Sequence, residues 1–409
     1  MASTKNNPKR KKPPPQNPIE AAIKAWCHSS ALVQQSKPCD EELVAQAPKR
    51  WTVYEPMVLL PAGSFDSSIW KQLLSGFSAE HMDALWVQIL AEISKRTGGP
   101  HLTHLGVNEG IPAALHYKTM EESSQEVETT KDCRAHENIL RSPTGLRILH
   151  GDFGPASDED TALDFERAFW VSTRQNGVFQ TWAPRWTMFS RGNIKEKARL
   201  LDFRSRHLEN GVALENAWAV DLYAGIGYFT FSYAKLGMRV LCWELNPWSV
   251  EGLRRGAQGN GWSVRVVEEK NVLALPKEEL LRGDERIIVF LEDNRHALRR
   301  IQELSGLDMN ILHVNCGLLP TSYASWKDAW NIAVWSKGEE SWLHLHENVG
   351  VADIERRREE IERYFSDLAR QDGSDRVARV EHTELVKTFA PGVWHCVFDL
   401  YIKRTNSII

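Results

Sequence analysis

Residues 220–229 read Val-Asp-Leu-Tyr-Ala-Gly-Ile-Gly-Tyr-Phe, so an acidic side chain comes just before a Gly-x-Gly turn. The apolar run 217–223 predicts a strand that ends near Asp221, and a helical pattern follows the turn. Glycine permits tight turns and the close approach of a ligand. Ligands of open α/β sheets bind at the carboxyl ends of the strands. We therefore expect Asp221, Ala224 and Gly225 to line a small-molecule site.

The same turn indicates which kind of ligand it accepts. A dinucleotide site requires Gly-x-Gly-x-x-Gly, and Thr230 stands where the third glycine would be. The acid in front of the turn would also repel a pyrophosphate. These residues suit a cationic ligand without phosphate, such as S-adenosylmethionine, whose amino group Asp221 could meet directly or through water.

Two further predicted strands also end in carboxylates. Glu244 follows Asp221 by 23 residues, and a carboxylate there can accept hydrogen bonds from both ribose hydroxyls. The next strand ends in Leu-Glu-Asp-Asn at 291–294, where Asp293 or Asn294 can read an adenine edge. The competing interpretation is an ordinary α/β sheet whose acids only cap helices.

Apolar strand-like runs alternate with helical patterns from residue 217 onward. This alternation predicts an α/β fold, a Rossmann-like class I transferase domain over 206–409 with a mostly parallel, seven-stranded sheet. The expected strands are 217–223, 238–244, 287–291, 311–314, 341–346, 377–381 and 393–401. The expected helices are 229–236, 247–259, 296–304, 323–334 and 352–369.

The first half of the chain is more mixed. Residues 1–18 are basic and proline-rich, which predicts a disordered tail that could contact nucleic acid, serve as a nuclear address or simply be solvated. Residues 19–205 predict a smaller α+β domain that positions a substrate. Within it, Gln175-Asn176-Gly177 lies between two strand-like runs and is typical of a hairpin turn.

Bulk composition gives weaker guidance. Of the 409 residues, 42% are hydrophobic and 25% charged, and the net charge is −4, which slightly disfavours a nucleic-acid partner. None of the six cysteines forms a Cys-x-x-Cys pair, so we expect no structural metal, no disulfide framework and a reducing, cytoplasmic setting. No apolar run reaches the roughly 18 residues of a membrane span. A monomer is the simplest expectation.

The stretches 221–230 and 243–247 resemble the superfamily of tRNA guanine-37 N1-methyltransferases and wybutosine-synthesising proteins. Further stretches are similar to the wybutosine-synthesising protein 2 branch, namely 188–197 (Met-Phe-Ser-Arg-Gly-Asn-Ile-Lys-Glu-Lys), 315–320 (Asn-Cys-Gly-Leu-Leu-Pro), 344–349 and 387–395. This resemblance implies transfer of the 3-amino-3-carboxypropyl group of S-adenosylmethionine to C7 of 4-demethylwyosine in the anticodon loop of phenylalanine tRNA. It extends from about residue 169 to 401.

The resemblance also implies cofactor contacts for Ser190, Lys197, Glu244, Asp293 and Asn294. Lys197 would meet the cofactor carboxylate. The segments 263–285, which is longer than expected, and 102–165 depart from the family pattern.

Two residues are candidates for the chemistry itself. Glu196 is a candidate general base for the proton on C7, and the alternative is a salt bridge to Arg191, Lys195 or Arg199. Asn315 is a candidate reader of the base edge, and the alternative is a structural turn held by Gly317 and Pro320.

The stretch 185–199 is locally basic, so it could neutralise tRNA phosphates, or it could be a solvated helix. Trp182, Trp186 or Phe189 could stack on a flipped base. His344, His346 and His395 are interpreted as satisfied strand histidines. Guanine-37 N1-methylation and a non-catalytic RNA-binding scaffold remain alternative functions.

Overall fold

The computed structural model describes residues 16–29, 40–99, 101–108, 114–115, 136–137, 145–155, 164–209, 214–268, 283–304 and 309–405. The predicted tail therefore lies almost wholly outside the described residues. The contacts divide the chain into two compact units, Met1–His136 with Pro143–Ala156, and Glu137–Ser142 with Ser157–Ile409. The division falls well before the boundary at 205/206 that the sequence suggests.

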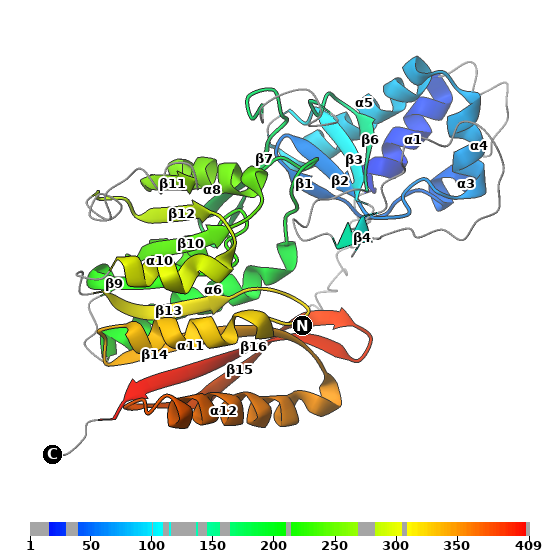
Figure 1. Ribbon diagram of the computed structural model, residues 1–409. Helices are drawn as coiled ribbons and strands as arrows, with labels where there is room; N and C mark the ends of the chain where they lie inside the picture. Colours follow the sequence, from blue (N-terminus) through cyan, green and yellow to red (C-terminus); the bar gives the residue numbers. More distant parts are fainter. Residues whose placement is uncertain are drawn as a thin grey trace, which may run out of the picture. The chain divides into compact units, whose positions relative to one another are not determined.

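The first unit is a four-stranded sheet with helices, coloured blue to cyan in Figure 1. Its strand order is β1-β2-β3-β6, and only β2 and β3 are parallel. The core contains fully buried Trp70, Leu85 and Ile89. The elements are α1 (Pro18–Ser29), α3 (Asp40–Ala45), β1 (Thr52–Tyr54), β2 (Met57–Leu60), α4 (Ser68–Gly76), α5 (Ala79–Thr97), β3 (His104–Asn108) and β6 (Leu146–His150). A separate two-stranded sheet pairs β4 (Ala114–Leu115) with β5 (His136–Glu137).

The second unit contains an eight-stranded sheet in the order β11-β12-β10-β9-β13-β14-β16-β15, with helices on both faces (Figure 1). β16 runs antiparallel to β14 and β15 on either side of it, and the other strand pairs of this sheet are parallel. The strands are β9 (Ala217–Asp221), β10 (Arg239–Glu244), β11 (Val264–Glu268), β12 (Ile287–Leu291), β13 (Asn310–Cys316), β14 (Glu340–Gly350), β15 (Arg376–Ala390) and β16 (Val393–Arg404). This confirms the α/β, mostly parallel prediction.

The prediction of seven strands is wrong by one. Residues 264–268 are mostly half-buried and pair in parallel with β12, so they form the edge strand β11. In the sequence, this segment belongs to the long connection 263–285. A five-residue edge strand beside a polar stretch gives a weak periodic signal.

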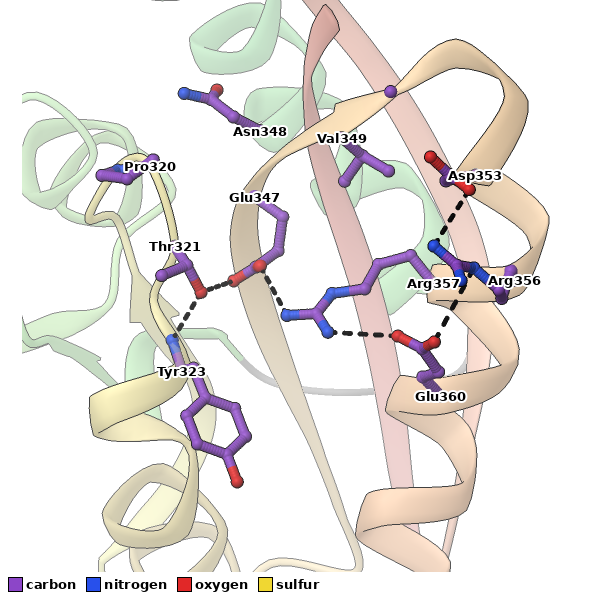
Figure 2. A pocket seen from close by; sticks show the side chains of 11 residues that line it. Pro320, Thr321, Tyr323, Glu347, Asn348, Val349, Asp353, Arg356, Arg357 and Glu360 are labelled. Carbon is purple, nitrogen blue, oxygen red and sulfur yellow. Dashed lines mark hydrogen bonds and ion pairs between the residues drawn. The ribbon is translucent and has the colours of Figure 1, made fainter.

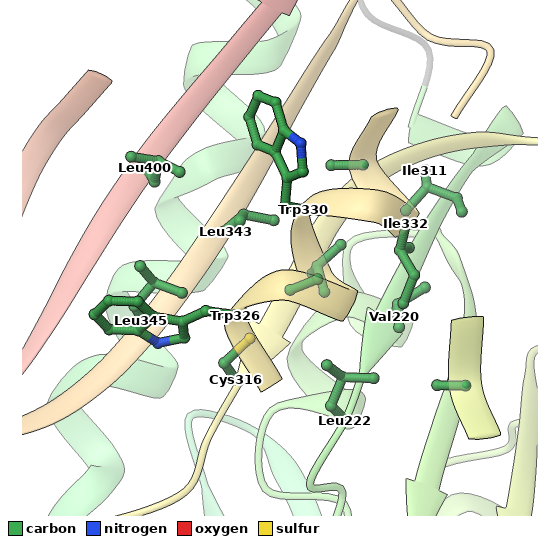
Figure 3. Packing of buried hydrophobic residues seen from close by; sticks show 14 of the residues in the cluster. Val220, Leu222, Ile311, Cys316, Trp326, Trp330, Ile332, Leu343, Leu345 and Leu400 are labelled. Atoms are coloured by element: carbon green, nitrogen blue, oxygen red, sulfur yellow. The ribbon is translucent and has the colours of Figure 1, made fainter. Parts of the chain in front are cut away.

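Helices cover the two faces of this sheet and separate two cores. α10 (Ala297–Glu303), α11 (Trp326–Trp335) and α12 (Ile354–Gln371) bury one face, and α6 (Ile194–Glu209), α7 (Thr230–Lys235) and α8 (Pro247–Gly259) the other. Figure 3 shows Trp326 and Trp330 of α11 in the same cluster of buried residues as Val220, Leu343 and Leu345. Because alternate strand residues point to opposite faces, Val220 and Ala219 belong to different cores.

The hairpin of β7 (Val171–Gln175) and β8 (Val178–Trp182) belongs to this second unit, because it packs on α8. A Cβ atom on Gly252 would lie 2.9 Å from the Thr181 carbonyl oxygen, and one on Gly259 would lie 2.4 Å from the Phe179 ring. Glycines on one face of α8 therefore let β8 approach. The predicted Asn176-Gly177 turn is confirmed, with φ of +51° and +70°.

Candidate functional site

The Gly-x-Gly loop begins where β9 ends, at the carboxyl edge of the sheet. Gly225 and Gly227 have φ of +55° and +90°, which L side chains rarely adopt. A Cβ atom on Gly225 would lie 2.7 Å from the Tyr228 ring, and one on Gly227 would lie 2.5 Å from the Phe231 ring. The glycines are therefore required by both the backbone and the packing of the loop.

Asp221 is fully buried beneath this loop. Its carboxylate accepts hydrogen bonds from Asn315 Nδ2 at 2.9 Å, Thr230 Oγ1 at 2.8 Å and the Tyr223 N–H at 3.3 Å. Burial raises the pKa of Asp221, and the bonds from Asn315 and Thr230 partly offset that rise. Asp221 therefore orders the loop and Asn315. These partners differ from the cofactor amino group that the sequence led us to expect.

Glu244, at the end of β10, keeps a partly exposed side chain. Its two carboxylate oxygens accept the N–H groups of Gly225 and Asn246, each at 2.8 Å. Burial raises the pKa of Glu244, and the bonds from Asn246 and Gly225 counteract the effect. The carboxylate is thus fixed against the Gly-x-Gly loop, and a carboxylate can accept about four hydrogen bonds in all.

Asp293 and Asn294 follow β12, the next strand of the sheet. Asp293 caps the short helix η4 (Asn294–His296) and pairs with the exposed side chain of Arg295 at 2.8 Å. Burial by itself would raise the pKa of Asp293, but the bonds from Arg295 lower it. Asn294 Nδ2 donates to the Leu222 carbonyl oxygen at 2.8 Å. The ends of β9, β10 and β12 therefore lie together at one edge of the sheet, as expected.

Lys197 is buried, and no carboxylate of the described residues forms an ion pair with it. Its ammonium group donates to Gln180 Oε1 at 2.8 Å and Gln175 Oε1 at 3.1 Å, and lies about 5 Å from the ring centroids of Phe189 and Tyr228. Burial lowers the pKa of Lys197 to about 7, and repulsion from Lys387 adds to this. A buried cation held only by neutral groups favours an anionic ligand nearby.

Ser190 lies at the start of the helix η1 (Arg191–Asn193), above the same aromatic rings. Its N–H donates to the Tyr228 hydroxyl at 3.2 Å, and Tyr228 in turn donates to the Met188 carbonyl oxygen. Tyr228 therefore connects the Gly-x-Gly loop to Ser190, which places two groups of predicted cofactor residues against one ring.

Glu196 takes the alternative predicted for it, a salt bridge to Arg199. It is fully buried, and its oxygens accept Arg199 Nε at 2.8 Å and an Arg199 terminal nitrogen at 2.6 Å. Arg199 also bonds both carboxylate oxygens of Asp399, which lies on β16. Burial raises the pKa of Glu196, and the Arg199 bonds counteract it. This geometry favours a structural ion-pair network over a general base.

The basic stretch and its aromatic residues are also largely engaged. Lys195 pairs with Glu384 at 2.6 Å, while Lys197 and Arg199 point inward. Trp182 stacks on Phe189 with ring centroids 4.5 Å apart, and Trp186 stacks on Trp248 at 5.0 Å. All three proposed stacking rings are therefore already stacked on another protein ring, and Trp182 is also buried.

Glu347, which was not among the predicted site residues, holds the loop after β13. Glu347 of β14 accepts Thr321 Oγ1, Ser322 N–H and Ser322 Oγ, and it pairs with Arg357 of α12 at 2.8 Å (Figure 2). A cavity of about 610 Å³ lies here, and none of the predicted site residues lines it. Its arginines are paired with Glu347, Asp353 and Glu360, so it offers little attraction for an anion.

No protein-family model matches the chain. The tRNA wybutosine-synthesizing protein 2 of Schizosaccharomyces pombe is 38% identical over 355 residues, which cover 86% of this chain and 72% of that protein. The protein of the same name from Saccharomyces cerevisiae is 32% identical and covers 88% of this chain and 75% of that protein. The chain belongs to the tRNA wybutosine-synthesizing protein 2 family.

Solved structures agree with the fold of this family. A crystal structure of P. horikoshii TYW2 in complex with MeSAdo has a TM-score of 0.54 and 17% identity, and covers 94% of this chain and all of that chain. Trm5b from Pyrococcus abyssi has a TM-score of 0.51 and 13% identity, with coverage of 90% and 79%. At these identities the likeness supports the shared fold alone.

The described residues hold no group of three or more His, Cys, Asp or Glu side chains arranged to bind a metal ion. Within the same residues, no helix combines the length and apolar character that crossing a membrane would require.

Proposed function

We propose that the protein transfers the 3-amino-3-carboxypropyl group of S-adenosylmethionine to C7 of 4-demethylwyosine at position 37 of phenylalanine tRNA, with release of methylthioadenosine. The observation that carries this proposal is the meeting of Glu244, Asp293 and the Gly-x-Gly loop at one sheet edge, in a chain of the wybutosine-synthesizing protein 2 family. We expect the protein to act as a cytoplasmic monomer on the anticodon loop.

The residues at this edge fit the proposed donor. Glu244 is fixed by two backbone N–H groups and partly exposed, so it can accept ribose hydroxyls. Asp293 can accept from an adenine amino group if the exposed Arg295 side chain turns away. Lys197, buried among neutral groups, suits the carboxylate of the methionine part.

The sulfonium of the donor supplies a good leaving group, so the protein mainly has to orient the reactants. Methyl transfer and aminocarboxypropyl transfer differ in which carbon beside the sulfur faces the base. Lys197 and Ser190 both contact Tyr228, which follows the Gly-x-Gly loop. They would therefore hold the amino-acid part of the donor beside this ring. The first unit and the exposed Arg191 would hold the tRNA.

The experiment uses the full chain with two tRNA substrates, phenylalanine tRNA that contains 4-demethylwyosine and the same tRNA with unmodified guanine 37. We expect an aminocarboxypropyl adduct on the first substrate, together with methylthioadenosine, by mass spectrometry. Methylguanine and S-adenosylhomocysteine from the second substrate would instead support the methyltransferase alternative. Absence of donor binding in calorimetry would favour the scaffold.

A further inference from the structure

The sheet contains two buried pairs of histidines, and the two pairs differ in the hydrogen bonds that their outer ring nitrogens make. In one pair, His313 Nδ1 lies 2.9 Å from His344 Nε2, and His344 Nδ1 lies 2.7 Å from Asp399 Oδ1. In the other pair, His346 Nδ1 lies 3.0 Å from His395 Nε2. The outward nitrogens of this second pair, His346 Nε2 and His395 Nδ1, are buried and have no hydrogen-bond partner among the described residues.

Other unpartnered polar atoms lie close to this second pair. Asn348 stands directly opposite His395 across the β14–β16 ladder, and both polar atoms of its side chain lack partners within the described part of the chain. Figure 2 shows the Asn348 side chain directed away from that of Glu347. Asn315 Oδ1 also has no hydrogen-bond partner in that part of the chain. Buried polar atoms are normally satisfied, so a cluster of exceptions requires an explanation.

This polar cluster, formed by Asn315, His346, Asn348 and His395, adjoins the Gly-x-Gly loop. The Phe229 ring lies 5.0 Å from the His346 ring, between centroids. A Cβ atom on Gly317 would lie 3.0 Å from Asn315 Nδ2 and 3.7 Å from the Phe229 ring. Phe229 thus links His346 to Asn315, at the edge where the proposed function places the base.

We propose that the polar cluster receives the flipped nucleobase and that the His346–His395 pair accepts the proton that leaves the base carbon during transfer. This inference rests on the proposed function. The histidine pair takes the role of general base that was expected of Glu196, because both Glu196 carboxylate oxygens already bond Arg199.

The hydrogen bond within the pair guarantees an acceptor. A neutral imidazole has one N–H and one lone pair. If His346 donates to His395, the lone pair of His346 Nε2 faces outward, and if His395 donates, that of His395 Nδ1 does. One of the two outward nitrogens can therefore take a proton with either arrangement of the shared hydrogen.

The pair is also in the neutral form that this role requires. Burial lowers the pKa of His395 to about 4, with a contribution from Lys387. Burial lowers the pKa of His346 well below its ordinary value, and His395 adds to this. Weak bases suffice here, because an alkylated aromatic cation releases its ring proton readily.

The base carbon donates a π-electron pair to the methylene carbon of the donor, and the carbon–sulfur bond breaks with its electrons on sulfur, so a neutral thioether leaves. The base cation then loses its C7 proton to the imidazole, and the electrons of the carbon–hydrogen bond restore the double bond. The imidazolium releases its proton to water after the product departs.

Lys387 marks the route by which the base enters. It stands opposite His395 in the β15–β16 ladder and lies 3.5 Å from Ser190 Oγ, a long hydrogen bond. Its side chain passes over Gly192, where a Cβ atom would lie 2.6 Å from Lys387 Cδ. A partly exposed side chain with one long bond can be displaced at little cost, so the base reaches the pair by moving Lys387.

The test measures single-turnover transfer to tRNA whose 4-demethylwyosine carries hydrogen or deuterium at C7. We expect His346→Asn with His395→Asn to slow transfer by about 10²–10⁴-fold, and each single variant by a smaller factor, because one imidazole remains. Proton loss then limits the rate, so the variants show a primary isotope effect that the unaltered protein lacks. Donor binding by calorimetry and thermal unfolding establish that each variant is folded.

The matched control is His313→Asn, which removes a buried histidine from the other pair and is expected to show no isotope effect. If the double variant, or both single variants where the double variant does not fold, transfers at the unaltered rate or is slowed without an isotope effect, the proposal is overturned. If the unaltered protein forms no aminocarboxypropyl product, the proposed function fails instead. The single variants keep the test decisive should the double variant not fold.

Discussion

Asn315 Nδ2 donates a 2.9 Å hydrogen bond to Oδ1 of Asp221, and both side chains are fully buried at the ends of the neighbouring strands β13 and β9. Because a carboxylate accepts only, this bond fixes Asn315 Nδ2 toward Asp221 and leaves the amide oxygen for another partner. The remaining oxygen, Asn315 Oδ1, is an acceptor without a partner among the described residues. A base edge at this site should therefore present an N–H group.

Asn315→Ala is expected to lower the rate of transfer while donor affinity stays nearly constant. Loss of one hydrogen bond between a neutral acceptor and the base is worth about 1 kcal/mol, and loss of orientation adds to this, so we expect roughly a 10-fold effect. Single-turnover kinetics and calorimetry measure the two quantities. An unchanged rate would remove Asn315 from the base site.

Glu244→Gln is expected to weaken donor binding about 10- to 100-fold, because a charge-assisted hydrogen bond contributes about 1.5–3 kcal/mol. Glu292→Gln is the matched control. Glu292 is also an acid at a strand end, but it is buried against Arg300 at 2.9 Å and Trp243 at 3.2 Å.

Glu292→Gln should lower the free energy of unfolding by roughly 3 kcal/mol, because it breaks a buried ion pair. Its affinity for the donor should stay unchanged. Calorimetry gives the dissociation constants, and denaturant unfolding gives the free energies of unfolding. Equal losses of affinity in both variants would mean that Glu244 has no special contact with the donor.

Gly225→Ala tests the loop that faces the donor. The added methyl group meets the Tyr228 ring at 2.7 Å, and Tyr228 supports Ser190. Gly373 has nearly the same φ, +58° against +55°, but open space around it. Gly373→Ala should cost about 1–2 kcal/mol of backbone strain alone. Gly225→Ala should cost more and also weaken donor binding, as unfolding and calorimetry would report. Similar losses of free energy of unfolding in both variants, with donor affinity intact, would show that the Tyr228 ring can move aside without cost.

Much of the sheet edge could be predicted because the carboxyl ends of parallel strands meet in a known order. That rule located Asp221, Glu244 and Asp293 from strand patterns alone. It could not give the burial of Asp221 or its bond to Asn315, 94 residues away. The bond from Arg199 to Asp399 spans 200 residues, so the sequence could only suggest a local salt bridge for Glu196.

The histidine pairs were missed for a related reason. Which histidines meet depends on the register between β14 and the antiparallel β16, where Asn348 opposes His395 and His346 opposes Val397. A shift of one residue would turn these side chains to the other face of the sheet. Strand periodicity predicts the face but not the register, so the contact between His346 and His395 required the structure.

Lys197 makes stability depend on pH in a calculable direction. Its pKa is lowered from 10.5 to about 7 in the folded protein, so between these values the unfolded chain binds one more proton at this group. Stability then rises with pH, by up to about 1.4 kcal/mol per pH unit from this group. Below pH 7 both states are protonated and the slope disappears.

The measurement compares the unaltered protein with Lys197→Met by urea unfolding at pH 7, 8 and 9. The difference in free energy of unfolding should move in favour of the unaltered protein as pH rises. A constant difference across this range would mean that Lys197 keeps its proton in the folded state.

Donor binding should reverse this titration if the donor carboxylate meets Lys197. At pH 8 a group with a pKa of about 7 is mostly neutral, and an anion beside the amine restores the charged form. Binding should therefore take up close to one proton at pH 8, and much less at pH 6. Calorimetry in buffers with different heats of ionisation measures this uptake, and Lys197→Met should abolish it. Binding without proton uptake at pH 8 would place the donor carboxylate away from Lys197, even if Glu244 still holds the ribose.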